Sequence, residues 1–401
     1  MRAVHDAVIV GGGVAGSTCA ILLAQAGWSV VLVEKQGFPR RKVCGECIAA
    51  SNLALIDALG VGEKFRAIAG PPLRQVAWCA GDSVIEAPLP RFRGDRQSWG
   101  RALGREHLDT LLLDRARELG ATILQPFAAR SVNHDHDRQR CVVIDSAAAE
   151  HVVDAKLLID AHGSWQRGPL SVRTPLRRAR ASDLFAFKAN FSSARLREGI
   201  LPVLAFAGGY GGMVQGDHGL LTLACCIRRD RLRRCREEHP GVAAGEAVQR
   251  LLEQEIGAVR KTLDGAHREG AWLAVGPIQP RIGNAEPAAD VFAVGNAAGE
   301  AHPILGEGIS MAMQSAFVLC ERLVADGPGR SRYARAWRRA FAARIGLAPV
   351  YAHIAMHPRA TRIVLPILRR WPGLLTFGAR LGGKTRCVVD ARSASSVPAH
   401  G

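Results

Sequence analysis

Near its N-terminus the chain reads Asp6-Ala7-Val8-Ile9-Val10-Gly11-Gly12-Gly13-Val14-Ala15-Gly16. The first five residues of this stretch are mostly apolar and rich in β-branched side chains, which predicts a buried parallel strand. The glycines follow at the spacing G-x-G-x-x-G. The next residues predict a helix over 14–26 that ends at Gly27, and a second strand over 28–33 that is closed by Glu34. This order predicts a Rossmann βαβ unit that binds a dinucleotide.

The glycine spacing has a physical basis. Gly11 permits a tight turn, Gly13 lets the backbone approach a pyrophosphate, and Gly16 lets the helix pack closely on the strand. The helix N-terminus adds free N–H groups and a positive dipole end. Glu34 lies 18 residues after Gly16, where a carboxylate takes a ribose hydroxyl. The expected nucleotide contacts are Gly11, Gly13, Val14, Ala15, Gly16, Glu34 and Lys35.

The chain is basic: Lys and Arg number 53 and Asp and Glu 36 in 401 residues, a net charge of +17. Two interpretations stay open, a solvated basic surface or a surface for an anionic partner such as a phosphate group or an acidic membrane. We expect no nucleic-acid partner. No recognition motif is present, and aromatic residues that could stack on bases are only 5% of the chain.

Ten cysteines and no secretory leader predict free thiols and a cytoplasmic location. The uncharged stretch from Ala7 to Val33 is long enough to span a membrane, but its glycines and polar residues favour the soluble βαβ unit. Cys44 and Cys47 form a C-x-x-C pair. The sequence has no second such pair beside it, so we expect no metal site.

Four further segments resemble a known family: residues 38–46 (FPRRKVCGE), 104–112 (GREHLDTLL), 157–164 (LLIDAHGS), and 290–309, which contains VGNAAG and PILGEGI. They are similar to the geranylgeranyl-reductase-like group of flavoproteins. That group lies within the p-hydroxybenzoate-hydroxylase-like monooxygenase class, which also holds aromatic monooxygenases and flavin halogenases. The resemblance covers about residues 5–325 and implies FAD as cofactor, with NAD(P)H or a partner reductase as electron source.

The resemblance also implies the remaining flavin contacts. Arg40 and Lys42 would meet the pyrophosphate, and Arg105 would reach toward FAD. His162 and Asn296 each replace an Asp of the family pattern, and His162 is open to a structural or a catalytic role. The contacts implied in this way are Arg40, Lys42, Cys44, Gly45, Arg105, His162, Gly163, Gly295, Asn296, Pro303, Gly306, Glu307, Gly308 and Ile309.

The predicted fold class is α/β, a Rossmann-like FAD-binding domain with an inserted antiparallel β-sheet substrate domain and a helical C-terminal region. We expect the FAD-binding domain over residues 1–75, 100–180 and 281–325, the substrate domain over 76–99 and 181–280, and the basic region over 326–401. Alternation predicts strands at 185–191, 201–206, 211–215 and 220–227. The three weak candidates for catalysis are His162, Tyr210 and His302.

The basic C-terminal region mixes apolar residues with arginine and Trp371. Residues 363–377 would lie in a membrane interface, as a peripheral contact on the inner face, or pack as a helix on the substrate domain. We expect residues 393–401 to be disordered.

Two functions follow. The first is an FAD-dependent monooxygenase that hydroxylates a lipophilic phenolic or polyketide-like small molecule in secondary metabolism. The alternative is an FAD-dependent reductase of isoprenoid double bonds. The family's Gly-Glu-Gly-Ile form at 306–309 favours the reductase. The absence of the reductase group's Trp and Pro after Tyr210 favours the monooxygenase. The two-Trp signature of halogenases is missing.

Overall fold

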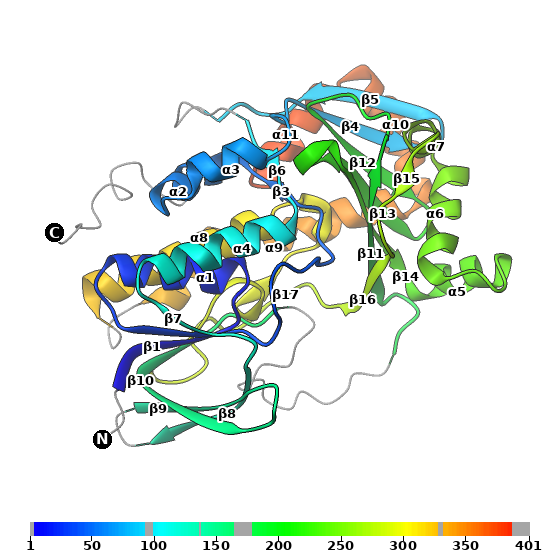
Figure 1. Ribbon diagram of the computed structural model, residues 1–401. Coiled ribbons are helices and arrows are strands. Elements are labelled where there is room, and N and C mark those ends of the chain that lie inside the picture. The colour runs from blue at the N-terminus through cyan, green and yellow to red at the C-terminus, as the bar shows by residue number, and fades with distance from the viewer. Residues whose placement is uncertain (1–3, 93–98, 136–137, 164–178, 328–331, 387–401) are drawn as a thin grey trace.

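The predicted βαβ unit is present as strand β1 (Val4–Val10), helix α1 (Val14–Gln25) and strand β2 (Val30–Val33). The computed structural model describes residues 4–92, 99–135, 138–163, 179–327 and 332–386 (Figure 1). β1 pairs in parallel with β2 on one side and with β10 on the other. The short apolar strand is therefore central in its sheet, as its composition predicts.

The first sheet has seven strands in the order β7-β2-β1-β10-β9-β8, with β18 paired to β10. The added strands are β7 (Thr122–Leu124), β8 (Ala128–Asp135), β9 (Arg138–Ile144), β10 (Glu150–Asp160) and β18 (Val291–Ala293). Since β10 pairs in parallel with both β1 and β18, two segments about 290 residues apart in sequence lie beside the same strand. This arrangement confirms the predicted Rossmann-like α/β class.

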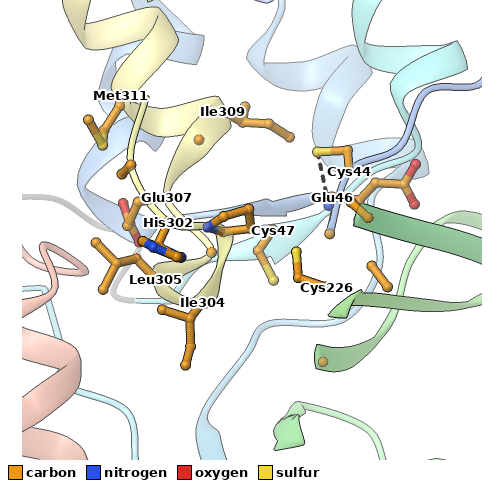
Figure 2. Close-up of a pocket in the computed structure, with 18 of the residues that line it drawn as sticks. Cys44, Glu46, Cys47, Cys226, His302, Ile304, Leu305, Glu307, Ile309 and Met311 are labelled. Atoms are coloured by element: carbon orange, nitrogen blue, oxygen red, sulfur yellow. Dashed lines mark hydrogen bonds between the residues drawn. The ribbon is translucent and has the colours of Figure 1, made fainter. Parts of the chain in front are cut away.

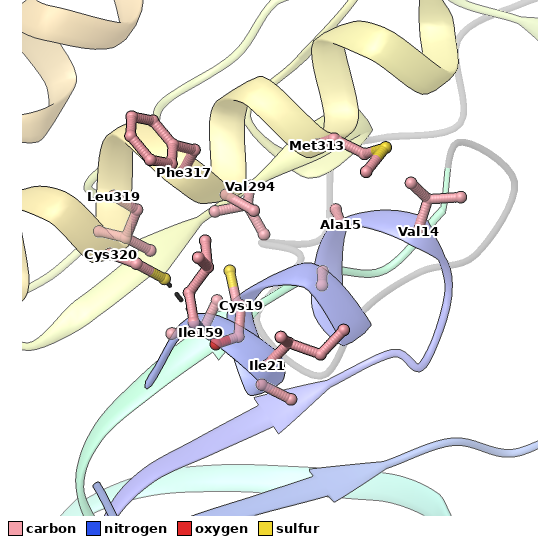
Figure 3. Packing of buried hydrophobic residues seen from close by; sticks show 14 of the residues in the cluster. Val14, Ala15, Cys19, Ile21, Ile159, Val294, Met313, Phe317, Leu319 and Cys320 are labelled. Carbon is pink, nitrogen blue, oxygen red and sulfur yellow. Dashed lines mark hydrogen bonds between the residues drawn. The ribbon is translucent and has the colours of Figure 1, made fainter. Parts of the chain in front are cut away.

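Helices α1, α4 (Arg105–Glu118) and α8 (Gly308–Asp326) cover one face of this sheet (Figure 1). Figure 3 shows their core, where Cys19, Ile159, Val294 and Leu319 are completely buried. The α1 helix buries almost every residue up to Leu23. A helix that is apolar all round is expected where other helices and a sheet enclose it.

The second sheet has eight strands in the order β15-β11-β14-β13-β12-β4-β5, with β16 paired to β11. Its strands are β4 (Gln75–Ala80), β5 (Ser83–Pro88), β11 (Leu184–Ser192), β12 (Ile200–Phe206), β13 (Gly209–Gln215), β14 (Leu221–Arg228), β15 (His267–Arg268) and β16 (Leu273–Ile278). The four strands predicted by alternation are therefore present.

Two expectations for this sheet are wrong. One pair, β12 with β4, is parallel, because β4 arrives through a long connection and no hairpin turn fixes its direction. In addition, a region predicted as sheet contains the helices α5 (Arg229–Glu238), α6 (Ala244–Glu255) and α7 (Gly257–Leu263). The buried residues Ala247, Val248, Leu251 and Leu252 follow the helical period of 3.6, and they pack on one face of the sheet.

The C-terminal region is helical, as predicted, with α9 (Tyr333–Met356), α10 (Pro358–Arg370) and α11 (Gly373–Leu381). These helices lie against the opposite face of the second sheet from α5–α7 (Figure 1). Among the described residues, no helix has the length and apolarity needed to cross a membrane. The segment 393–401, expected to be disordered, lies outside the described residues.

Short elements complete the chain. They are β3 (Cys47–Ile48), α2 (Leu53–Ala58), α3 (Gly62–Ile68), β6 (Arg101–Ala102), β17 (Arg281–Ile282) and β19 (Gly299–Glu300).

Candidate active site

A cavity of about 450 Å³ runs from the glycine turn of the first sheet to the second sheet and the C-terminal helices. Of the cofactor contacts predicted from the sequence, all but Gly16 and Lys35 line it. Gly16 lies behind the wall, where a Cβ atom would come within 1.9 Å of the Gly11 carbonyl oxygen. This is the close packing predicted for it. The Lys35 side chain is exposed, and the structure does not bring it together with the others.

Glu34 lies at the nucleotide end of the cavity, at the carboxyl end of β2. Its carboxylate is 5% exposed and is held by two backbone donors: the Gly12 N–H bonds Oε2 at 2.8 Å and the Gln36 N–H bonds Oε1 at 2.9 Å. These bonds fix the carboxylate beside the N-terminus of α1. The position suits the ribose contact that the sequence predicts.

Three cations from two distant segments meet next to this turn: Arg40 and Lys42 from the loop after β2, and Arg105 from the start of α4. Arg105 donates two bonds of 2.7 Å to Asp109, and Arg40 lies 3.3 Å from the same carboxylate and 4.0 Å from Glu34. Burial, together with the neighbouring Arg105 and Arg40, lowers the pKa of Lys42 to about 8. The cluster therefore carries more positive than negative charge and would be stabilised by an anion.

An unsatisfied donor supports the same conclusion. The Nε atom of Arg40 is buried and has no hydrogen-bond partner among the described residues. A pyrophosphate beside the N-terminus of α1 would supply acceptors and negative charge together. The residues present thus fit the ADP half of FAD.

The flavin end of the cavity is built by the segment from Gly295 to Ile309. Gly306 adopts φ 61°, a left-handed conformation that favours glycine. The next residue, Glu307, is 1% exposed and forms an ion pair of 2.8 Å with Lys384, which also donates to the Gly306 carbonyl at 3.1 Å. Asn296 also lines the cavity here. The loop is thereby fixed against the N-terminus of α8, as a flavin-binding loop requires.

Lys384 was not found from the sequence. It belongs to no motif in the C-terminal region, and no local pattern marks it as a partner of Gly306 and Glu307, about 80 positions earlier. Burial lowers the pKa of Lys384, but Glu307 and Cys47 together outweigh burial and raise it overall. The C-terminal region therefore completes the flavin end of the cavity.

His162 lies in the cavity wall beside Gly11 and Gly163. Its Nδ1 is 2.5 Å from Asp160 Oδ1, and its backbone N–H also donates to that oxygen, at 3.2 Å. Both contacts orient the ring from the end of β10. His162 accordingly belongs to the cofactor end of the cavity, close to the Rossmann glycine turn.

The other two catalytic candidates meet at the second sheet. The Tyr210 hydroxyl, on β13, lies 3.1 Å from His302 Nδ1 (Figure 2 shows His302 in the cavity wall). Burial raises the pKa of Tyr210 and lowers that of His302 to about 4. Both groups are therefore uncharged near neutral pH and can form a relay for a single proton.

Two thiols lie in the same part of the cavity (Figure 2). Burial raises the pKa of Cys47 to about 11 and that of Cys226 to about 12. Each thiol therefore keeps its proton at neutral pH. The cysteines that the structure describes are all free, as the sequence predicts.

A buried ion pair joins the loop between β2 and β3 to the second sheet. Lys188 on β11 is completely buried and bonds Glu46 of that loop, whose other oxygen accepts the Thr222 hydroxyl at 2.5 Å. Glu46 also accepts the Arg105 backbone N–H at 3.1 Å. The network couples the β2–β3 loop to the second sheet, and no local sequence pattern marks it because its members come from distant segments.

A second link between the sheets joins α4 to the β13–β14 turn. His107 Nε2 lies 3.1 Å from Asp217 Oδ2, and the nitrogen and oxygen atoms of His107, Asp217 and His218 lie within 4.8 Å of one another. Asp217 also accepts the Gly104 N–H at 2.7 Å. The sequence spacing points only to the cysteine pair as a possible metal ligand, because His107 and Asp217 are far apart in the chain.

Comparison with known proteins places this geometry in a family. The menaquinone reductase of Mycobacterium tuberculosis is 32% identical over 41% of this chain and 38% of its own length, so the chain matches well under half of that relative. The menaquinone reductase of Mycolicibacterium smegmatis is 25% identical over 96% of this chain and 93% of that protein. The solved structure of the flavin-dependent brominase Bmp2 is similar in fold, with 20% identity, a TM-score of 0.74, and coverage of 98% of this chain and 97% of that one.

The family model described as "FAD binding domain" matches residues 5–335. That range contains both glycine segments, the cation cluster and the Tyr210–His302 pair. The chain belongs to this FAD-binding family.

Proposed function

We propose that the protein is a monooxygenase that hydroxylates a lipophilic phenolic or polyketide-like compound. One observation carries the proposal: the neutral Tyr210–His302 pair is set in a cavity whose substrate end is otherwise largely apolar. The apolar lining there includes Val76, Trp78, Leu201, Val203, Leu368 and Leu375. Such a site suits a molecule with one polar head and an apolar body.

The residues have distinct tasks in this proposal. The apolar lining binds the body of the substrate and excludes water. Because Nδ1 of His302 faces Tyr210, Nε2 is the ring nitrogen that would bond a substrate hydroxyl and take or return its proton. FAD, when bound, supplies the redox chemistry. The Arg40–Lys42–Arg105 cluster and the Gly306 loop hold the cofactor in place.

A single turnover with isotopic oxygen tests the proposal. Chemically reduced protein is mixed with ¹⁸O₂ and 5-pentadecylresorcinol, and the product is analysed by mass spectrometry. We expect one ¹⁸O atom in the product, and a yield or rate lowered about 100-fold in H302N, since a positioned acid–base group contributes about 10²–10⁴. H353N, at an exposed histidine of α9, is the control. Unlabelled product, or equal rates in H302N and native protein, would refute the proposal.

A second function is favoured by the two protonated thiols. An isoprenoid double-bond reductase needs a proton donor inside an apolar cavity, and Cys47 or Cys226 could serve. The similarity to the menaquinone reductase of Mycolicibacterium smegmatis over nearly the whole chain also supports a reductase. Reduced protein is mixed with menaquinone-4 without oxygen, and the extract is then reoxidised in air so that any quinol returns to the quinone. Saturation of one isoprenoid double bond would then leave a quinone two hydrogens heavier. C47S or C226S would abolish the addition of these two hydrogens, whereas H302N would leave the addition unchanged.

A further inference from the structure

The outer face of the C-terminal helices carries a continuous row of exposed apolar side chains. Ile363 and Ile367 lie on α10, Trp371 lies in the link, and Leu374, Phe377 and Leu381 lie on α11, with exposed fractions between 39 and 66%. Within each helix the intervals are three or four residues, the spacing of one helix face. We call these six residues the apolar row.

Basic side chains flank the apolar row. Exposed arginines lie on the same two helices at Arg359, Arg362, Arg369, Arg370 and Arg380. The sequence contains no aspartate or glutamate between Asp326 and Asp390. The positive charge on this surface is thus not neutralised by acidic side chains of the same segment, which suits an anionic partner.

The inner face of these helices forms the substrate end of the cavity. Val364 and Leu368 of α10 and Leu375 of α11 line the cavity. Leu374 does so as well, although it is 43% exposed. The apolar row is therefore continuous with the interior, at the point where an apolar molecule would enter.

We propose that α10 and α11 bind the surface of an anionic lipid bilayer, with the apolar row immersed in the headgroup region and the arginines on lipid phosphates. Apolar burial and electrostatic attraction add in such contacts. The helices lie on the membrane with the mouth of the cavity toward the lipid. A lipophilic substrate then passes from the bilayer past Leu374 without crossing water.

Vesicle co-sedimentation of the FAD-loaded full chain tests the docking surface. The probes are vesicles of phosphatidylcholine with phosphatidylglycerol, and of phosphatidylcholine alone. We expect binding to the anionic vesicles, with affinity lowered about tenfold or more in I363S/W371S/F377S and similarly in R359Q/R362Q/R370Q. The matched controls are I282S/V324S, at exposed apolar residues elsewhere, and R233Q/R234Q/R236Q, at exposed arginines of α5.

A second measurement reports how deeply the apolar row enters the bilayer. Brominated lipid should quench the fluorescence of native protein and much less that of W371F. Binding that survives in I363S/W371S/F377S, or that duplex DNA displaces completely, would overturn the proposal, because the surface would then attract anions by charge alone. Neither assay involves substrate or turnover. Vesicle binding without ¹⁸O incorporation would therefore refute only the monooxygenase.

Discussion

Replacing Gly13 by alanine tests the cofactor site most directly. Gly13 is the N-cap of α1 at φ −72° and ψ −175°, an extended conformation that alanine adopts freely. A Cβ atom there would meet only the ends of two flexible side chains, Arg105 Nη2 at 3.5 Å and Arg40 Nη2 at 3.9 Å. The methyl group would thus occupy the space between the helix N-terminus and the guanidinium groups, where the pyrophosphate is expected.

The expected loss of FAD affinity follows from the hydrogen bonds to the pyrophosphate that the methyl group would displace. A hydrogen bond to a charged group contributes about 1.5–3 kcal/mol, so losing one such bond weakens FAD binding about 10- to 150-fold. The fold should be unaffected, with the melting temperature of the apoprotein changed by less than about 2 °C. G13A therefore separates cofactor affinity from stability.

The assay is titration of deflavinated protein with FAD, followed by quenching of flavin fluorescence, beside thermal unfolding of the same apoprotein. G37A is the matched control, because a Cβ at Gly37 meets nothing within 4 Å. In contrast, G16A should destabilise the apoprotein, since its Cβ would clash with the Gly11 carbonyl. A Kd for G13A within twofold of native, or an apoprotein as unstable as G16A, would refute the placement of the pyrophosphate.

Three further predictions concern buried groups. K188M leaves the Glu46 carboxylate buried without its cation, so the free energy of unfolding should fall by about 3–5 kcal/mol in urea titrations. The pKa of His302 is about 4 when folded and 6.5 when unfolded. The unfolded state therefore takes up the proton first, and stability should be highest above pH 6.5 and fall by about 3 kcal/mol toward pH 4. Iodoacetamide at pH 8 should leave Cys47 and Cys226 unmodified in native protein, as peptide mass spectrometry would show.

Each of these has a control. K156M removes a lysine that is 68% exposed and should cost under about 1 kcal/mol; a similar loss in K188M would contradict the buried ion pair. H302N should flatten the pH dependence between 6.5 and 4, and an unchanged slope would rule out His302 as its source. Alkylation of Cys47 or Cys226 as fast as in urea would show that these thiols are accessible.

The residues at the cofactor end of the cavity were predictable because they lie in short local segments of the sequence. Gly11, Gly13 and Glu34 lie within one βαβ unit, whereas the second glycine segment around Gly306 was indicated by its resemblance to a family. Local resemblance also sufficed for Arg105. In each case, the residues that act together are close in sequence or belong to a recognisable segment.

The other residues of the site could not be predicted from the sequence, because they act through contacts between distant segments. Lys188 belongs to a strand with alternating residues, and its burial follows only from Glu46, 142 residues earlier. Lys384 likewise reaches Glu307 from a helical region with no motif of its own. The helices α5–α7 were missed for a different reason, because the strand pattern on either side was extended through them.

The pairing of β10 with both β1 and β18 has a consequence for biosynthesis. Gly11 and Gly308 line the same cavity, so a growing polypeptide lacks the flavin end of the pocket at least until residues 295–309 have been translated. During that interval, α1 has no α8 to cover its apolar surface, which is a state that chaperones bind. Flavin capture is therefore a late event, and it follows the release of most of the chain from the ribosome.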